Sequence, residues 1–183
     1  RGVYPATVTP MLGDGSVDEP SVARLMAHFE SAGCKGVVLA GTNGEGPSLS
    51  TFEKRDLLRT AHSFKGNLKV ILGVATPSLS EAEWLCSQAA KNGADAVLVM
   101  PPSYYRSASE GGVVAWFEYL ADKSPSPLLA YNFPKMTGFT MSSEFVARLS
   151  RHKNIVGFKD SSGDENNLET YRAAAPGKDL FVG

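Results

Sequence analysis

The amino-acid sequence predicts an α/β fold in which parallel strands alternate with helices. Short runs of β-branched and other apolar residues recur roughly 25 to 35 residues apart, which leaves room for one helix in each gap. The gaps contain apolar residues at three- and four-residue intervals, the period of a helix. Runs such as "VVLA" (37–40) and "VLVM" (97–100) are apolar throughout, which is typical of parallel strands buried on both faces.

The runs predict strands at residues 3–8, 36–40, 69–75, 94–100, 127–131, 155–159 and 180–182. The helices expected between them cover residues 19–31, 50–64, 80–92, 109–122, 142–150 and 165–174. Ser50, Ser80 and Ser109 are candidate N-caps, and "STFE" (50–53) and "SEAE" (80–83) each match a capping box. Gly33 and Gly93 are expected to end two of the helices.

The loops after the strands decide between two architectures. An open doubly wound sheet binds its ligand at a switch point, whereas a closed (β/α)8 barrel binds it on all the loops that follow the strands. Distinctive polar, Gly-containing or Pro-containing loops follow nearly every expected strand, at residues 9–10, 41–45, 76–77, 101–105, 132–134 and 160–163. The sequence therefore favours a (β/α)8 TIM barrel.

The length of the chain accounts for only part of such a barrel. A barrel of this type typically needs about 250 residues, and the chain has 183. We expect residues 1–183 to form a single catalytic barrel domain whose C-terminal part is missing, with six βα units and the start of a seventh strand. Roughly another hundred residues would then complete the protein.

The composition is that of an ordinary globular protein and excludes several partners. Hydrophobic residues make up 43% and charged residues 20% of the chain, and the net charge is −1 without any block of like charges. Neither a nucleic-acid nor a membrane partner is expected. Cys34 and Cys86 lie far apart, which offers no disulfide framework and predicts a reducing, cytoplasmic compartment. Because the chain begins without Met, a removed organellar targeting peptide stays open.

The stretch "IVGFKDSSGD" (155–164) places Lys159 at the last position of an apolar run, directly before a polar loop. One interpretation is a strand-end lysine that extends its ammonium group into solvent. The other is a nucleophile that forms a Schiff base, because partial removal from water favours the neutral amine that attacks carbonyl groups. The second interpretation also requires a proton donor and a group that binds a carboxylate.

Two further stretches offer those groups. Tyr131 ends the preceding expected strand, where its phenol could exchange protons with an adduct on Lys159 or simply pack at the rim. The loop "GTNGE" (41–45) has two glycines for a tight turn, and the Thr42 hydroxyl with nearby N–H groups could hold a small carboxylate. A phosphate cradle is the competing interpretation, but the loop lacks the glycine and lysine spacing of the known phosphate motifs.

The order and separation of "GTNGEGPSLS" (41–50), "MPPSYYR" (100–106), "LLAYNFPKMTG" (128–138) and "IVGFKDSSGD" (155–164) resemble one known family. This is the dihydrodipicolinate synthase / N-acetylneuraminate lyase family of class I aldolases, and the resemblance covers residues 2–183. It implies that Lys159 forms the Schiff base with pyruvate or another 2-oxo acid and that Tyr131 is the catalytic tyrosine.

The resemblance also implies roles for other residues. Thr42 matches the hydroxyl residue of a proton relay, and Asn43 matches the neighbour that helps to bind the 2-oxo acid carboxylate. Tyr104 matches the relay tyrosine that enters the partner subunit's site, although a shift of one residue in the alignment would put Tyr105 there. A pair of surface aromatic residues is the other interpretation. Members of the family are usually tetramers built from two dimers, so a homo-oligomer is implied.

The sequence departs from dihydrodipicolinate synthases at one position. Those enzymes carry an arginine two residues after the proline that follows the catalytic tyrosine, and here Met136 stands there. A thioether cannot pair with a carboxylate, although Lys135 could compensate as a point charge. The motifs are closer to 4-hydroxy-2-oxoglutarate aldolase-like and 2-keto-3-deoxy sugar-acid aldolase-like members, and Ser161 would then contact the substrate near the imine.

The leading hypothesis is an aldolase that needs no cofactor and no metal, makes or cleaves a carbon–carbon bond next to a pyruvate moiety, and uses an aldehyde as the second reactant. His28, His62 and His152 fall on or near predicted helices, so the ligands of a metal-dependent aldolase are not offered. Three alternatives stay open: a dihydrodipicolinate synthase, a non-catalytic 2-oxo acid sensor, and a barrel that binds a phosphosugar.

Overall fold

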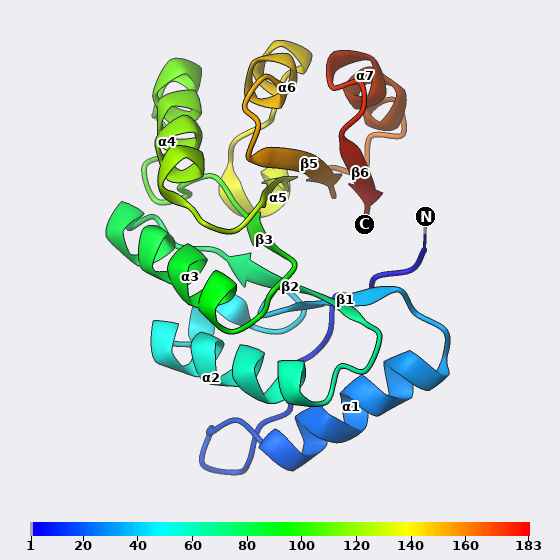
Figure 1. Cartoon of the computed structure of the whole chain (residues 1–183). Coiled ribbons are helices and arrows are strands. Elements are labelled where there is room, and N and C mark those ends of the chain that lie inside the picture. The colour runs from blue at the N-terminus through cyan, green and yellow to red at the C-terminus, as the bar shows by residue number, and fades with distance from the viewer. Residues whose placement is uncertain (1) are drawn as a thin grey trace.

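The computed structural model describes residues 2–183 and shows a single curled, parallel sheet covered by helices (Figure 1). The six strands are arranged in chain order, and each is parallel to the next. They are β1 (Gly36–Leu39), β2 (Lys69–Val74), β3 (Ala96–Val99), β4 (Leu128–Asn132), β5 (Ile155–Asp160) and β6 (Asp179–Val182). This is the architecture of a partial (β/α)8 barrel, as the sequence predicts.

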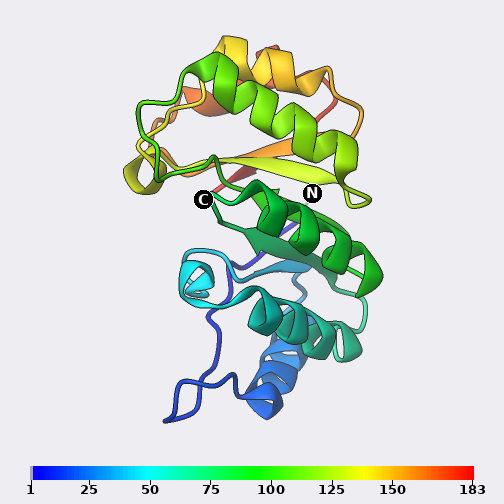
Figure 2. The same ribbon diagram turned by 90° about the vertical axis from the view of Figure 1, so that its left-hand side faces the viewer.

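The helices lie on the outer side of the curl, while both ends of the chain lie at its open side (Figures 1 and 2). The long helices are α1 (Glu19–Ser31), α2 (Thr51–Ser63), α3 (Leu79–Lys91), α4 (Glu110–Lys123), α6 (Ser143–Ser150) and α7 (Asn167–Ala174). Two short elements, the 3-10 helix η1 (Gly46–Ser48) and α5 (Pro134–Thr137), follow β1 and β4 and were not predicted from the sequence.

The predicted first strand at residues 3–8 is not a regular strand. This segment runs beside β1 and makes one parallel bridge, between Ala6 and Val38. The backbone N–H of Val38 donates to the carbonyl of Pro5 at 2.8 Å, and the N–H of Thr7 donates to the carbonyl of Val38 at 3.0 Å. Because Pro5 has no N–H and a fixed φ, it interrupts the regular ladder that the apolar pattern suggests.

One predicted cap is also wrong. Ser78, and not Ser80, is the N-cap of α3, and its side chain accepts a hydrogen bond from the backbone N–H of Glu81. Ser80 therefore lies inside the first turn, and the predicted capping box at 80–83 does not form. The caps at Ser50 and Ser109 are confirmed. Gly33 and Gly93 have φ of 77° and 79°, which is the left-handed conformation expected after a helix.

The alternating side chains of the strands build two apolar layers. One layer faces the helices and contains most of the buried core, including Leu72, Val99 and Phe158. The other faces the inside of the curl and is formed by Val38, Ile71, Ala96, Leu98, Leu129 and Tyr131. Tyr4 and Phe181 pack against this inner layer and against each other, with ring centroids 5.2 Å apart.

The register between β4 and β5 contains a bulge. It exchanges the sides of the sheet on which the later side chains of β5 lie. Leu128 pairs with Ile155, but the next residue, Leu129, pairs with Gly157, so Val156 is an extra residue in β5. Beyond this bulge, Tyr131 pairs with Lys159. If the same residues paired one to one without the bulge, Tyr131 would pair with Phe158, and Lys159 would face the helices. The bulge therefore turns Lys159 to the inside of the curl.

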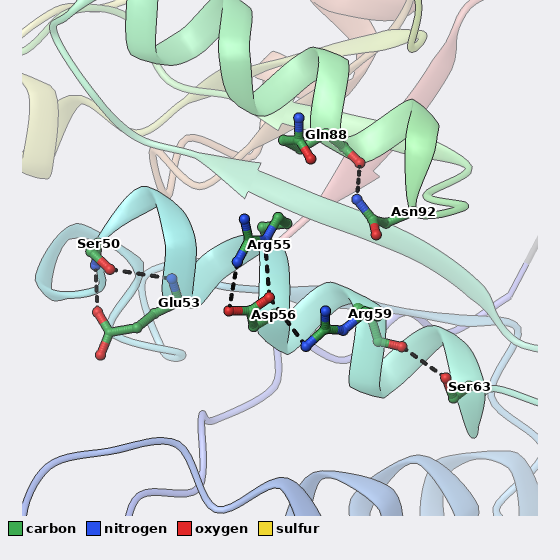
Figure 3. Close-up of polar contacts among 8 residues, drawn as sticks. All are labelled: Ser50, Glu53, Arg55, Asp56, Arg59, Ser63, Gln88 and Asn92. Atoms are coloured by element: carbon green, nitrogen blue, oxygen red, sulfur yellow. Dashed lines mark hydrogen bonds and ion pairs between the residues drawn. The ribbon is translucent and has the colours of Figure 1, made fainter.

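Helix α2 begins with a complete capping box (Figure 3). The Ser50 hydroxyl accepts from the backbone N–H of Glu53 at 3.2 Å, and the Glu53 carboxylate accepts from the backbone N–H of Ser50 at 2.8 Å. Two backbone donors that lack a partner within the helix are satisfied in this way. The cap fixes where the loop after β1 ends, and that loop carries Thr42 and Asn43.

We expect Ser50→Ala to lower the free energy of unfolding by about 1 kcal/mol, because it removes the side-chain partner of a helix N-terminal N–H. Urea unfolding of the full-length protein measures this. Ser63→Ala is the matched control: the Ser63 hydroxyl donates only to the Arg59 carbonyl in the last turn of the same helix, at 3.1 Å (Figure 3). Equal losses in the two variants would contradict a specific role of the cap.

Candidate active site

Lys159 and Tyr131 meet on the inner side of the curl, at the carboxyl ends of β5 and β4. The Lys159 ammonium donates to the Tyr131 hydroxyl at 3.3 Å and lies 4.3 Å from the centroid of the Tyr131 ring. The Tyr131 hydroxyl in turn donates to the Ser161 hydroxyl, also at 3.3 Å. A lysine, a phenol and a serine hydroxyl thus form a chain along which a proton can move.

The Tyr131 ring is held in place by its surroundings. Only 4% of the residue is exposed, and its ring stacks on Phe133 with the centroids 5.6 Å apart. Lys159 is half-buried, and its side chain also lines an apolar cavity of about 370 Å³ on the inner face of the sheet. The flexible lysine is therefore positioned against a rigid phenol.

The loop after β1 makes the tight turn that its glycines predict. Ala40 and Glu45 have φ of 50° and 52°, in the left-handed region that residues other than glycine rarely adopt. A Cβ on Gly46 would overlap the carbonyl oxygen of Ala40, so only glycine fits there. This turn brings Thr42 and Asn43 over the inner side of the sheet, and the Asn43 amide contacts the Ala6 carbonyl at 3.5 Å.

Five of the six predicted site residues line one cavity of about 330 Å³, which we call the Lys159 cavity. Its lining residues are Ala6, Thr42, Asn43, Tyr131, Phe133, Lys159, Ser161 and Gly183. The structure therefore brings together the amine, the phenol and three small polar side chains from the ends of three strands. Tyr131 bonds to Ser161 in this cavity, while Thr42 lines it without a hydrogen bond to the phenol within residues 2–183.

The sixth predicted residue, Tyr104, lies elsewhere. It is 77% exposed, packs edge-on against Tyr105, and lines a second cavity of about 670 Å³. We call this the Met136 cavity; its lining residues are Thr42, Pro47, Ala75, Pro77, Met100, Pro101, Ser103, Tyr104, Arg106 and Met136. Thr42 lines both cavities, so they adjoin at the mouth of the curl.

The opposite side of the same strand pair carries a buried polar network that sequence reasoning missed. Asn132 pairs with Asp160 in the register, and the two residues are 0% and 7% exposed. The Asn132 amide donates to the Asp160 carboxylate at 2.6 Å, and its own carbonyl oxygen accepts from the backbone N–H of Met141 at 3.0 Å. The network thus ties β4, β5 and the segment before α6 together.

Only neutral donors hold the Asp160 carboxylate in the described part of the chain. Besides Asn132, they are the Ser162 hydroxyl at 2.7 Å, the backbone N–H of Ser162 at 3.4 Å and the Asn167 amide at 3.3 Å. Burial raises the pKa of the neighbouring Tyr171 phenol, and the negative charge of Asp160 raises it further. Tyr171 therefore stays neutral and donates to the Met141 carbonyl at 2.7 Å.

Metal ligands, thiols and apolar helices complete the description of residues 2–183. No group of three or more His, Cys, Asp or Glu side chains in this range is arranged to hold a metal ion. Cys34 and Cys86 are both free thiols. No helix in this range is both long and apolar enough to cross a membrane.

The sequence contained a signal for the missed features. A glycine inside an apolar strand run, as at Gly157, often marks a bulge. A Cβ on Gly157 would lie 2.9 Å from the Cβ of Asp179 and from Leu129, so glycine is required by the close approach of β4 and β6. Once the bulge is recognised, the alternation places Asn132 and Asp160 together on the helix side.

We expect Asn132→Ala to lower the free energy of unfolding by about 2 to 4 kcal/mol, because it removes the shortest hydrogen bond to a buried carboxylate and leaves the backbone N–H of Met141 without its partner. Asn167→Ala is the matched control. It removes a longer contact to the same carboxylate from a half-buried position, and we expect a loss of about 1 kcal/mol or less. Urea unfolding of the full-length proteins compares them, and similar losses would contradict the central role of Asn132.

The chain matches one family over its whole length. The model of the dihydrodipicolinate synthetase family covers residues 1–183. A 4-hydroxy-tetrahydrodipicolinate synthase of Methanothrix thermoacetophila is 39% identical over 163 residues, covering 89% of this chain and 55% of the relative. A probable mitochondrial 4-hydroxy-2-oxoglutarate aldolase of Emericella nidulans is 38% identical over 182 residues, covering 95% of this chain and 59% of the relative.

Solved structures share the fold. A prophage protein of the dihydrodipicolinic acid synthase family from E. coli K12, in complex with pyruvate, superposes with a TM-score of 0.95 at 28% identity. The chloride-inhibited dihydrodipicolinate synthase of Acinetobacter baumannii, also with pyruvate, gives 0.95 at 32% identity. Each match covers 100% of this chain and 63% of the solved one. The chain spans a little over half the length of the curated relatives, and both its sequence and its fold show that it belongs to the dihydrodipicolinate synthetase family.

Proposed function

We propose that this chain carries the catalytic half of a class I aldolase, in which Lys159 forms a Schiff base with pyruvate or another 2-oxo acid. The observation that carries the proposal is the 3.3 Å contact between the Lys159 amine and the buried Tyr131 phenol, in a cavity that also holds Thr42 and Asn43. Two solved relatives were crystallised with pyruvate, which supports a substrate of this kind.

In the cleavage direction, the neutral Lys159 amine attacks the 2-oxo carbon. The Tyr131 phenol gives its proton to the hydroxyl of this adduct, which leaves as water while the protonated imine and a Tyr131 phenolate form. The Tyr131 phenolate takes the proton from the hydroxyl on the fourth carbon of the substrate. The bond between the third and fourth carbons then breaks, its electron pair moves towards the imine nitrogen, and an aldehyde is released. The enamine left on Lys159 takes up a proton at its third carbon, and water releases pyruvate.

The other groups in the Lys159 cavity bind and orient the substrate. Thr42 and Asn43 lie on the tight turn after β1, where the Thr42 hydroxyl and the Asn43 amide would hold the carboxylate next to the imine. Ser161 accepts from Tyr131 and so orients the phenol towards Lys159. A sensor without activity would need only the groups that bind the carboxylate, Thr42 and Asn43. The pairing of Lys159 with Tyr131 therefore favours the enzyme.

Borohydride reduction in the presence of pyruvate, followed by peptide mass spectrometry, tests the Schiff base. A stable adduct on Lys159 of the full-length protein is expected. If the folded protein gives no adduct, the sensor becomes the better proposal.

For the proton transfer, we expect Tyr131→Phe to lower kcat by about 10²-fold or more while the borohydride adduct still forms, because the phenol moves protons but does not supply the nucleophile. Tyr119→Phe is the matched control, since Tyr119 is an exposed tyrosine on α4. Turnover close to normal in Tyr131→Phe would reject the relay.

The substrate we propose is a 4-hydroxy-2-oxo acid or a 2-keto-3-deoxy sugar acid. Relatives of similar identity are named both 4-hydroxy-tetrahydrodipicolinate synthase and 4-hydroxy-2-oxoglutarate aldolase, so their names do not decide between the two reactions. Met136 favours the aldolase. It lines the cavity beside the Lys159 cavity, and it stands at the sequence position where the resemblance to dihydrodipicolinate synthases implies an arginine. Lys135, the possible substitute, is not among the residues that line either cavity.

Steady-state kinetics on a small panel of substrates tests this choice. We expect cleavage of a 4-hydroxy-2-oxo acid or a 2-keto-3-deoxy sugar acid to have a kcat/KM at least about 10-fold above that for condensation of pyruvate with aspartate semialdehyde, the scale of one lost charged contact. A clear preference for aspartate semialdehyde would instead favour the assignment as a dihydrodipicolinate synthase.

The assembly belongs to the proposal as well. A tetramer built from two dimers would allow the exposed Tyr104 to enter the site of a partner subunit, as the family resemblance implies. The single barrel domain that continues beyond residue 183 and the cytoplasmic location stay predictions.

A further inference from the structure

The Met136 cavity is lined mainly by apolar groups from four loops. Three prolines and two methionines line it, with Thr42, Ser103 and Tyr104 as its neutral polar residues. Among the residues that line it there is one cation, Arg106, and no acid. A mostly apolar cavity with a single charge is the pattern of a site that orients a ligand by one polar end.

Arg106 has no acidic partner in the described part of the chain. None of the ion pairs within residues 2–183 includes it. Its stem packs on the end of α5, since a Cβ on Gly138 would lie 3.2 Å from the Arg106 Cδ. Gly138 has φ of 69° and is the C-cap of α5, the short helix that carries Met136. The guanidinium is thus brought to the side of the cavity where Met136 lies.

We infer that Arg106 binds the distal carboxylate of the substrate and selects 2-oxo acids that carry a second carboxylate. This inference rests on the proposed function and names its substrate class: a five-carbon 4-hydroxy-2-oxo diacid, whose aldehyde product is a carboxylated aldehyde without an amino group. The first carboxylate lies at Thr42 and Asn43, the oxo carbon at Lys159, and the second carboxylate beyond Thr42 in the Met136 cavity. A guanidinium forms two parallel hydrogen bonds with a carboxylate, which a surrounding apolar wall strengthens.

The same charge distribution disfavours aspartate semialdehyde. That aldehyde carries an ammonium group on the carbon next to its carboxylate, and the lining of the Met136 cavity contains no acid to receive it. The lining therefore matches an anionic end fully and leaves the ammonium of a zwitterionic end without a partner.

The test compares two substrates that differ only at the distal end: 4-hydroxy-2-oxoglutarate and 4-hydroxy-2-oxopentanoate, in which a methyl group replaces the second carboxylate. In the full-length protein, Arg106→Met is expected to raise KM for the diacid by about 10- to 100-fold, the range for a lost charged pair. The KM for the methyl compound is expected to stay within about 2-fold, because it never contacts the guanidinium. The KM of Arg106→Lys for the diacid should fall between the values of the wild-type protein and of Arg106→Met.

Two further variants separate binding from a structural effect. Met136→Arg in the Arg106→Met background returns a guanidinium to the same cavity, and we expect it to recover part of the preference for the diacid. Arg151→Met is the matched control, because Arg151 is an exposed arginine at the end of α6. In that control the KM for neither substrate should change.

Borohydride trapping with pyruvate alone distinguishes a failure of the Arg106 role from a failure of the proposed function. Every variant should still form the Lys159 adduct, since pyruvate lacks the distal carboxylate. If trapping succeeds but Arg106→Met changes both substrates equally, or changes neither, the role of Arg106 is overturned while the proposed function stands. If the wild-type protein forms no adduct, the proposed function itself fails.

Discussion

The pairing of β4 with β5 is the constraint on which the candidate site depends. Its bulge at Val156 sets the register so that Tyr131 lies opposite Lys159 and Asn132 lies opposite Asp160. Because neighbouring residues of a strand face opposite sides, one register places the reactive pair inside the curl and the polar pair beneath the helices. The two pairs cannot be moved independently of each other.

This arrangement separates two electrostatic environments by the thickness of one backbone. On the inside, the Lys159 amine meets a phenol at the mouth of an open cavity, where a substrate can reach it. On the outside, the Asp160 carboxylate is buried and is satisfied by the side chains of Asn132, Ser162 and Asn167. These donors satisfy the carboxylate oxygens, and within residues 2–183 Asp160 makes no ion pair with Lys159, so the amine is left to face the substrate.

The fold could be predicted from the sequence because its signals are local. Strand and helix periods, together with caps such as Ser50, are properties of short segments, and most of these assignments are confirmed. The prediction of a regular strand at residues 3–8 was wrong, because Pro5 interrupts the hydrogen-bond ladder that its apolar neighbours suggest. At α3 two serines two residues apart competed for the same cap, and the pattern alone favoured the wrong one.

The candidate site was predictable only in part, for a different reason. Lys159 and Tyr131 stand at strand ends, and parallel neighbours bring strand ends together. The partner of each side chain depends on register, which the apolar pattern does not specify across a bulge. The position of Arg106 depends on how a long loop packs on Gly138, and no periodic signal describes such a contact. Residues on strands were therefore easier to place than those on loops.

The bulge next to Gly157 limits how β5 can change without loss of the site. Most strands tolerate exchange of one apolar residue for another, because volume and pattern are what packing requires. In β5 the pairing also matters, because one-to-one pairing of the same residues without the bulge would exchange the inner and outer faces for every residue after Val156. The chain would keep every chemical group of the site and yet direct the amine towards the helices. In this strand the chemistry depends on how the backbone pairs as well as on which residues it carries.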